Sequence, residues 1–104
     1  MKHEETASFL ADFRALTHDE RNDFLEAVRD LNRAFQTYRN AGGSGMPRAW
    51  PKKQRIKDVK SAPGIWEITW AWPDGRATFE FVDIDGALGI RWRRIGTHRI
   101  FEKP

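Results

Sequence analysis

Positive charge gathers beside a histidine in the segment RWRRIGTHRIFEKP, from Arg91 to Pro104. A histidine side chain has an unperturbed pKa of about 6.5, so both of its protonation states are accessible at neutral pH and His98 could transfer a proton. Arginine suits a phosphate group, because its planar fork donates hydrogen bonds in pairs and stays charged. Together with His98, the residues Arg91, Arg93 and Arg94 could therefore hold an anionic ligand and act on it.

The charge of the chain is unevenly distributed, although its net value is only +3. Residues 1–45 contain 6 Lys and Arg against 8 Asp and Glu, a balance of −2. Residues 46–104 contain 12 against 7, a balance of +5. This polarity indicates an anionic partner for the second half, and nucleic acid is one such partner.

Length and composition indicate a single folded domain. A chain of 104 residues is about the size of one compact domain, and its 5 Trp and 7 Phe supply enough apolar surface for a core. The sequence contains no cysteine, so it offers neither disulfide bonds nor thiolate metal ligands. The first residues lack the apolar run of a signal peptide, and no stretch approaches the roughly 20 apolar residues of a membrane span. We expect a cytoplasmic protein.

The first half of the chain has the pattern of two helices. Apolar residues recur at helical spacing between Thr6, a candidate cap, and Leu16. A second helix is predicted to begin after Thr17, because Thr17 and Glu20 match a capping box, and to end near Asn40 before a glycine-rich segment. The apolar residues of this helix form one stripe that needs a sheet to cover it: Phe24, Val28, Leu31, Phe35 and Tyr38.

The second half alternates with the period of two that is typical of half-buried strands. Strands are predicted for residues 65–72, 76–82 and 88–95, with a Pro-Asp-Gly turn between the first two. A short strand at residues 55–59 and an edge strand at residues 2–5 complete the predicted sheet. The strand at residues 65–72 is expected to carry four residues on its apolar face: Trp66, Ile68, Trp70 and Trp72.

These patterns predict an α+β fold in which an N-terminal two-helix hairpin packs on one face of a twisted, mainly antiparallel sheet of four to five strands. The helices bury their apolar stripe against the apolar face of the sheet, so the other face is expected to stay open. A charged face of this kind is most often only solvated, and patterning alone favours that interpretation over a binding site. The polar residues expected on or near the open face are Lys57, Lys60, Glu67, Thr69, Arg76, Thr78, Glu80, Arg91, Arg93 and His98.

Three short motifs, in their order and spacing, resemble the bacterial toxins of the RelE/ParE superfamily, in particular the RelE- and YafQ-like mRNA interferases. They are SAPGIWEI at residues 61–68, GRATF at residues 75–79, and RIGTH at residues 94–98 followed by Phe101. The resemblance covers essentially the whole chain, although the first half matches only in pattern. It implies one RelE-like toxin domain over residues 1–104 and a separately encoded antitoxin as partner.

The resemblance implies an endoribonuclease that cleaves mRNA, on the ribosome, without a metal ion or another cofactor. In this family the RNA 2′-hydroxyl attacks its own 3′-phosphate, so the protein must move two protons and stabilise negative charge.

His98 is similar to the tail histidine of these toxins, and Phe101 is similar to the aromatic residue that stacks on or orients a base. Arg76 corresponds to the arginine that clamps the scissile phosphate. Asp74 matches the aspartate of the family's Pro-Asp turn, where an aspartate is also common for structural reasons. The residues that would hold RNA or ribosomal phosphates are Lys57, Lys60, Arg91, Arg93 and Arg94.

The sequence departs from the family pattern at the second proton-transfer group. Tryptophans stand where YafQ-like toxins have a second histidine, and Glu67 and Thr69 stand where RelE has lysines. Glu67 could be the base beside Arg76, or it could be only the ion-pair partner of that arginine. No pair of histidines has ligand spacing on one element, which argues against a metal site.

Two other functions occur on the same fold. ParE-like toxins inhibit DNA gyrase without cleaving RNA, and other relatives bind RNA or protein without catalysis. The tail histidine distinguishes these classes, because an inhibitor of gyrase needs no proton transfer at that position.

Overall fold

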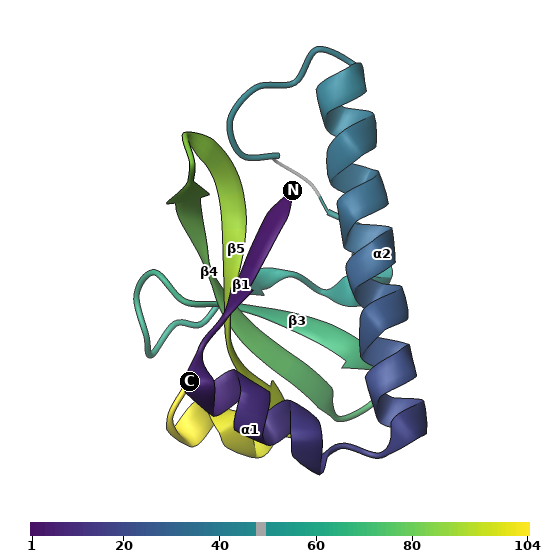
Figure 1. Ribbon diagram of the computed structural model, residues 1–104, viewed down its shortest axis with the longest axis vertical. Helices are drawn as coiled ribbons and strands as arrows, with labels where there is room; N and C mark the ends of the chain where they lie inside the picture. Colours follow the sequence, from purple (N-terminus) through teal and green to yellow (C-terminus); the bar gives the residue numbers. More distant parts are fainter. Residues whose placement is uncertain (48–49) are drawn as a thin grey trace.

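The structure is a computed structural model that describes residues 1–47 and 50–104, and two helices cover one face of its five-stranded sheet (Figure 1). The elements are β1 (Lys2–Glu5), α1 (Ala7–Ala15), α2 (His18–Asn40), the 3-10 helix η1 (Lys52–Gln54), β2 (Lys57–Asp58), β3 (Trp66–Ala71), β4 (Gly75–Ile84), β5 (Ala87–Gly96) and the 3-10 helix η2 (His98–Glu102). The strand order is β1-β5-β4-β3-β2, with β1 parallel to β5 and the other neighbours antiparallel. The predicted α+β class and the predicted edge strand are confirmed.

Each helix begins at a threonine that caps its first turn. The Thr6 hydroxyl accepts a hydrogen bond from the main-chain N–H of Phe9 at the start of α1. At the start of α2, Thr17 and Glu20 form the predicted capping box, with each side chain accepting from the other residue's main-chain N–H. No helix in the described part of the chain is long and apolar enough to cross a membrane.

The two helices do not form the predicted hairpin. In Figure 1, α1 lies across the lower end of the sheet, whereas α2 runs along the length of the molecule. Each helix is oriented by its own contacts with the sheet. The main-chain N–H of Thr6 donates to the Trp92 oxygen at 3.0 Å, which anchors the start of α1 to β5. The stripe of α2 packs on the sheet, and α2 meets α1 only near its own start, where Arg21 donates to the main-chain oxygens of Phe13 and Arg14 and Phe24 packs on Phe9.

The core lies between the helices and the sheet. Phe9 of α1 and Phe24 and Leu31 of α2 are buried there against residues of β3, β4 and β5. Trp72 was predicted to join this face but is 67% exposed, because β3 ends at Ala71 and the chain then enters the turn to β4. The buried strand residues of the core are Ile68, Trp70, Ala77, Phe79, Ile90, Trp92 and Ile95.

Two strands are less regular than the sequence predicts. β2 has only two residues: Arg55 adopts a left-handed backbone (φ 47°) where η1 ends, and Val59 already accepts a turn hydrogen bond from Ala62. The pairing of β4 with β5 shifts between Thr78 and Phe79, which face Arg94 and Trp92 respectively, so Arg93 is an extra residue in β5.

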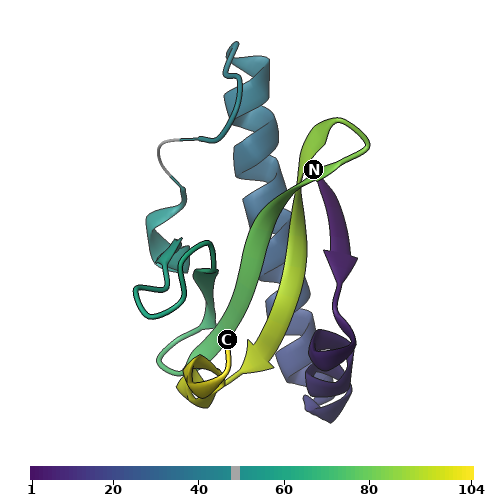
Figure 2. The same cartoon turned by 90° about the vertical axis from the view of Figure 1, so that its left-hand side faces the viewer.

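The second face of the sheet is not open as predicted. After β5 the chain turns back as η2, on the side of the sheet away from α2 (Figure 2). Thr78 is fully buried there, and its hydroxyl donates to the main-chain oxygen of Pro104 at 3.1 Å. Thr69 is also buried, at 6% exposed. The final segment therefore covers part of the face on which the candidate site lies.

Candidate active site

His98 and Asp74 form a hydrogen-bonded pair between η2 and the turn that joins β3 to β4. Nδ1 of His98 lies 2.5 Å from Oδ1 of Asp74, and the main-chain N–H of His98 points to the same oxygen at 3.4 Å. The hydrogen bond from His98 holds the pKa of Asp74 below its ordinary value, so the carboxylate is ionised and only accepts. Nδ1 therefore carries a proton, and Nε2 of this 70% exposed side chain is left for a ligand.

Two glycines allow the turns that bring this pair together. A Cβ atom on Gly75 would lie 2.8 Å from Cβ of Ala71, so the β3–β4 turn closes only with glycine there. A Cβ atom on Gly96 would lie 3.3 Å from Cγ2 of Ile100, so glycine lets η2 fold back closely on β5. The hydroxyl of Thr97 accepts from the main-chain N–H at the start of η2 and fixes its first turn. The sequence motifs thus position His98 and Asp74 locally, although 24 residues separate the two.

Arg76 is the strand arginine nearest to this pair in sequence, two residues after Asp74. It is half-buried on β4, where it lies opposite Thr69 of β3 and Gly96 of β5. Its positive charge helps to lower the pKa of Asp74. The side chain donates to the main-chain oxygen of Gly75 at 3.1 Å and makes no ion pair with any described residue. Its charged fork is therefore available to an anionic ligand.

Glu67 lies one strand away, opposite Thr78, with 12% of its side chain exposed. Burial raises the pKa of Glu67 above its ordinary value, and the charges of Lys57 and Arg76 partly oppose that rise. The Lys57 ammonium lies 3.8 Å from Oε1 of Glu67. The ion-pair partner of Glu67 is thus Lys57 rather than the Arg76 that the sequence suggested.

Each of the predicted RNA-binding arginines of β5 is paired with a carboxylate. Arg91 lies 2.7 Å from Glu4 and 3.7 Å from Glu80, and Arg93 lies 3.2 Å from Glu80. The charge of these two arginines is therefore largely balanced inside the molecule.

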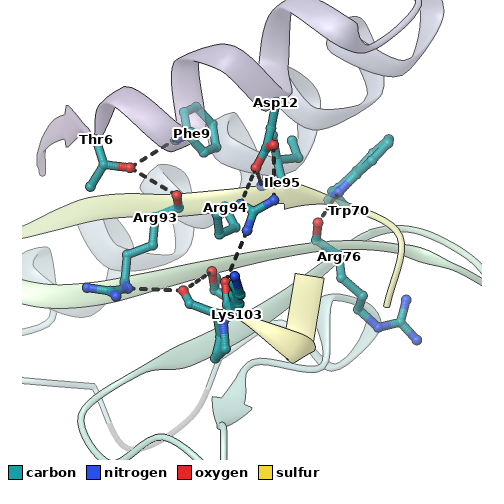
Figure 3. A network of polar contacts seen from close by, with 11 residues as sticks. Thr6, Phe9, Asp12, Trp70, Arg76, Arg93, Arg94, Ile95 and Lys103 are labelled. Atoms are coloured by element: carbon teal, nitrogen blue, oxygen red, sulfur yellow. Dashed lines mark hydrogen bonds and ion pairs between the residues drawn. The ribbon is translucent and has the colours of Figure 1, made fainter. Parts of the chain in front are cut away.

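Arg94 forms the third pair, which sequence reasoning missed. It binds both carboxylate oxygens of Asp12 in α1, at 2.6 and 3.2 Å, and this hydrogen bonding raises the pKa of Arg94. Figure 3 shows the pair at the centre of a network in which Arg94 also reaches the main-chain oxygen of Lys103. In the same view the guanidinium of Arg76 points away from that network. No pattern in the sequence links Asp12 to Arg94, because 82 residues separate them.

The remaining predicted residues lie around the site. Lys57 and Lys60 are exposed at and just after β2, and Lys60 makes no ion pair within the described chain. Phe101 is half-buried in η2, three residues after His98. Within residues 1–47 and 50–104, no three metal-ligating side chains converge.

Comparison with known proteins identifies the fold. The structure is similar to the Escherichia coli DinJ–YafQ toxin–antitoxin complex (TM-score 0.57, 15% identity, covering 94% of this chain and 92% of that chain). It is also similar to a YoeB/ParE toxin from Agrobacterium tumefaciens (0.52, 13%, 94% and 99%) and to a metal-bound toxin from Helicobacter pylori (0.52, 12%, 95% and 96%). No protein-family model and no curated protein sequence matches the chain. The chain thus shares the fold of these toxins, which is the fold that the resemblance of its motifs implied.

Proposed function

We propose that this protein is the toxin of a type II toxin–antitoxin system, and that it is an endoribonuclease that cleaves mRNA on the ribosome in the cytoplasm. The observation that carries the proposal is the exposed His98, held by Asp74 beside the unpaired Arg76. A side chain suited to proton transfer is thus joined to the β3–β4 turn, two residues before an arginine suited to phosphate binding, on a fold that known toxins share.

The proposed reaction is an internal transesterification of RNA. Arg76 holds the scissile phosphate and balances the negative charge that grows on it. The 2′-oxygen attacks phosphorus and loses its proton to a base, while the bond to the 5′-oxygen breaks and that oxygen gains a proton from an acid. The products are a 2′,3′-cyclic phosphate and a 5′-hydroxyl. No metal ion is required, because protein side chains accept one proton, donate the other and balance the negative charge.

We assign the base to Glu67 and the acid to His98. Burial raises the pKa of Glu67, which makes its carboxylate a better proton acceptor. The Asp74 carboxylate complements the positive charge that His98 carries when Nε2 is protonated. Phe101 would contact a base beside the cut, and Lys57 and Lys60 would contact the RNA backbone.

A cognate antitoxin is the proposed protein partner, since DinJ–YafQ was solved as a toxin–antitoxin complex. An acidic segment that covers Arg76 and His98 would block both phosphate binding and proton transfer.

The test is to incubate the purified protein with a defined mRNA, free or on ribosomes, and to map new 5′-hydroxyl ends by primer extension. A parallel supercoiling assay with DNA gyrase tests the alternative function, which is inhibition of gyrase. Cleavage in either RNA reaction supports the nuclease, and dependence on ribosomes supports the finer assignment. Inhibition of gyrase with intact RNA would establish the ParE-like function instead, and the absence of both effects would indicate a binding protein without catalysis.

A further inference from the structure

A cleft of about 430 Å³ lies between α2 and the end of β3 and shares no lining residue with the candidate active site. The end of β3 points toward α2 in Figure 1. Asp23, Glu26 and Asp30 form the α2 side of the cleft, and Trp72 and Gln54 lie among the residues of the other side. Three carboxylates thus line this cleft in a protein whose net charge is +3.

The acidic side of the cleft has unused negative charge. Asp23 and Glu26 are exposed and make no ion pair in the part of the chain that the structure describes. They are three residues apart on α2, so their side chains are neighbours that one cation can bridge. Asp30 is already paired with Lys53, itself a lining residue, at 3.0 Å and with Arg33 at 3.4 Å, so Asp23 and Glu26 carry the negative charge that is left for a ligand. RNA phosphates would be repelled here. A metal ion is not indicated, since the described residues contain no group of three ligands.

Trp72 adds an aromatic surface that suits a guanidinium group. Its side chain is 67% exposed, although large aromatic residues are usually buried. The guanidinium carbon of Arg55 lies 4.3 Å from the centre of the ring, in cation–π geometry. The indole therefore already binds one guanidinium and still has most of its surface exposed.

Gln54 supplies an acceptor that lacks a donor. The residue is 2% exposed, and its Nε2 donates to the main-chain oxygen of Ala27 at 2.7 Å. Its buried Oε1 has no hydrogen-bond partner among the described residues. Such an unsatisfied acceptor is unfavourable, and a ligand N–H group in the cleft would satisfy it once the Gln54 side chain turned toward the cleft.

We propose that this cleft binds an arginine side chain in a basic segment of a partner protein. A guanidinium group has five N–H donors in one plane, so it can bridge Asp23 and Glu26 while it stacks on Trp72. A lysine ammonium cannot stack in this way. The inference does not depend on the nuclease function, because the cleft and the His98 site share no residue.

The test uses the full chain and a capped hexapeptide, acetyl-Ala-Arg-Ala-Ala-Arg-Ala-amide, with a matched peptide in which citrulline replaces both arginines. Citrulline keeps the size and shape of arginine but is neutral. Binding is followed by NMR through the indole N–H of Trp72 and the amides of α2. The arginine peptide should shift these signals in a saturable way and should bind at least about threefold more tightly than the citrulline peptide.

Variants locate the site. The double variant Asp23→Asn/Glu26→Gln should weaken binding of the arginine peptide by about threefold or more, and Trp72→Ala should weaken it further. Asp19→Asn/Glu102→Gln removes the same charge outside the cleft and should change the affinity by less than about twofold. Equal binding of both peptides, or equal losses in the two double variants, would overturn the proposal.

Discussion

Glu67 shows how the surroundings of one residue change its chemistry. The sequence identified its position on a strand beside Arg76, and the structure adds that it is mostly buried and paired with Lys57. Burial favours the protonated form, so the pKa of Glu67 in the folded state lies above the value of 4.5 for a free side chain. The folded protein therefore binds this proton more tightly than the unfolded chain does.

The pH dependence of stability tests this difference. Because the folded-state pKa is the higher one, Glu67 makes the free energy of unfolding fall as pH rises from about 4.5 through that pKa. We expect Glu67→Gln to remove this fall and to be the more stable protein at neutral pH. Urea unfolding at several pH values between 4 and 8 measures the effect, with Glu102→Gln as an exposed control. Identical pH profiles for wild type and Glu67→Gln would contradict the buried environment of Glu67.

His98, Asp74 and Arg76 became candidates from the sequence because each lies in a short local motif. The Gly-Thr-His and Pro-Asp-Gly segments impose their turns through local backbone geometry, which a sequence displays directly. Whether an arginine is free of an internal ion pair depends on carboxylates that are distant in the sequence. The carboxylates of Asp12, Glu4 and Glu80 that neutralise the β5 arginines could not be assigned from spacing alone.

At the scale of elements, β5 joins the parts of the molecule. Its neighbours in the sheet are β1 and β4, and α1 is attached to it through Asp12, which accepts from Arg94 and from the main-chain N–H of Ile95 at 3.2 Å. Arg94 and Asp12 are 29% and 20% exposed, so their pair is shielded from water. The pair of Arg91 with Glu4 is more exposed, at 44% and 43%.

This difference predicts different costs for the two arginines. Arg94→Ala leaves a shielded carboxylate without its partner and should lower the free energy of unfolding by about 1.5–3 kcal/mol. Arg91→Ala breaks a more exposed, solvent-screened pair and should cost clearly less than Arg94→Ala. Urea unfolding of both variants measures the costs. Equal losses would show that Asp12 does not depend on Arg94 to hold α1 on the sheet.

Elements whose signals are local were predicted well, and their arrangement was not. Thr6, Thr17 and Glu20 mark the helix starts because a cap acts within one turn, and alternation gives β3 to β5 because neighbouring residues face opposite sides. The angle between the helices and the cover that η2 forms over β4 depend on contacts across the whole chain. Thr78 appeared exposed by alternation, but the final segment buries it.

At the scale of the whole molecule, the +5 balance of residues 46–104 overstates the charge available to a ligand. Arg91, Arg93 and Arg94 are balanced by internal carboxylates, whereas Arg76 and Lys60 have no such partner among the described residues. The proposed RNA surface therefore rests on a few free cations rather than on the dense cluster in the last strand.

The salt dependence of RNA binding measures how many of those cations contact phosphate groups. For about two to four phosphate contacts, the logarithm of the affinity for a single-stranded RNA should fall with that of salt concentration at a slope of about −1.5 to −3. Arg76→Ala should reduce this slope by about 0.7, and Arg91→Ala should change it less, because Glu4 and Glu80 already balance Arg91. Fluorescence anisotropy between 50 and 300 mM KCl provides the slopes. A flat response of the wild type would remove RNA as a ligand.

The central claim, that His98 transfers a proton during RNA cleavage, is tested most directly by the single-turnover cleavage rate of ribosome-bound mRNA. Its side chain is 70% exposed, so His98→Ala should leave the urea-unfolding curve nearly unchanged. If His98 is the acid, the rate should fall by about 10²- to 10⁴-fold, and Asp74→Asn should lower it in the same direction by disturbing the hydrogen bond to Nδ1. Cleavage by His98→Ala at the wild-type rate would contradict the account.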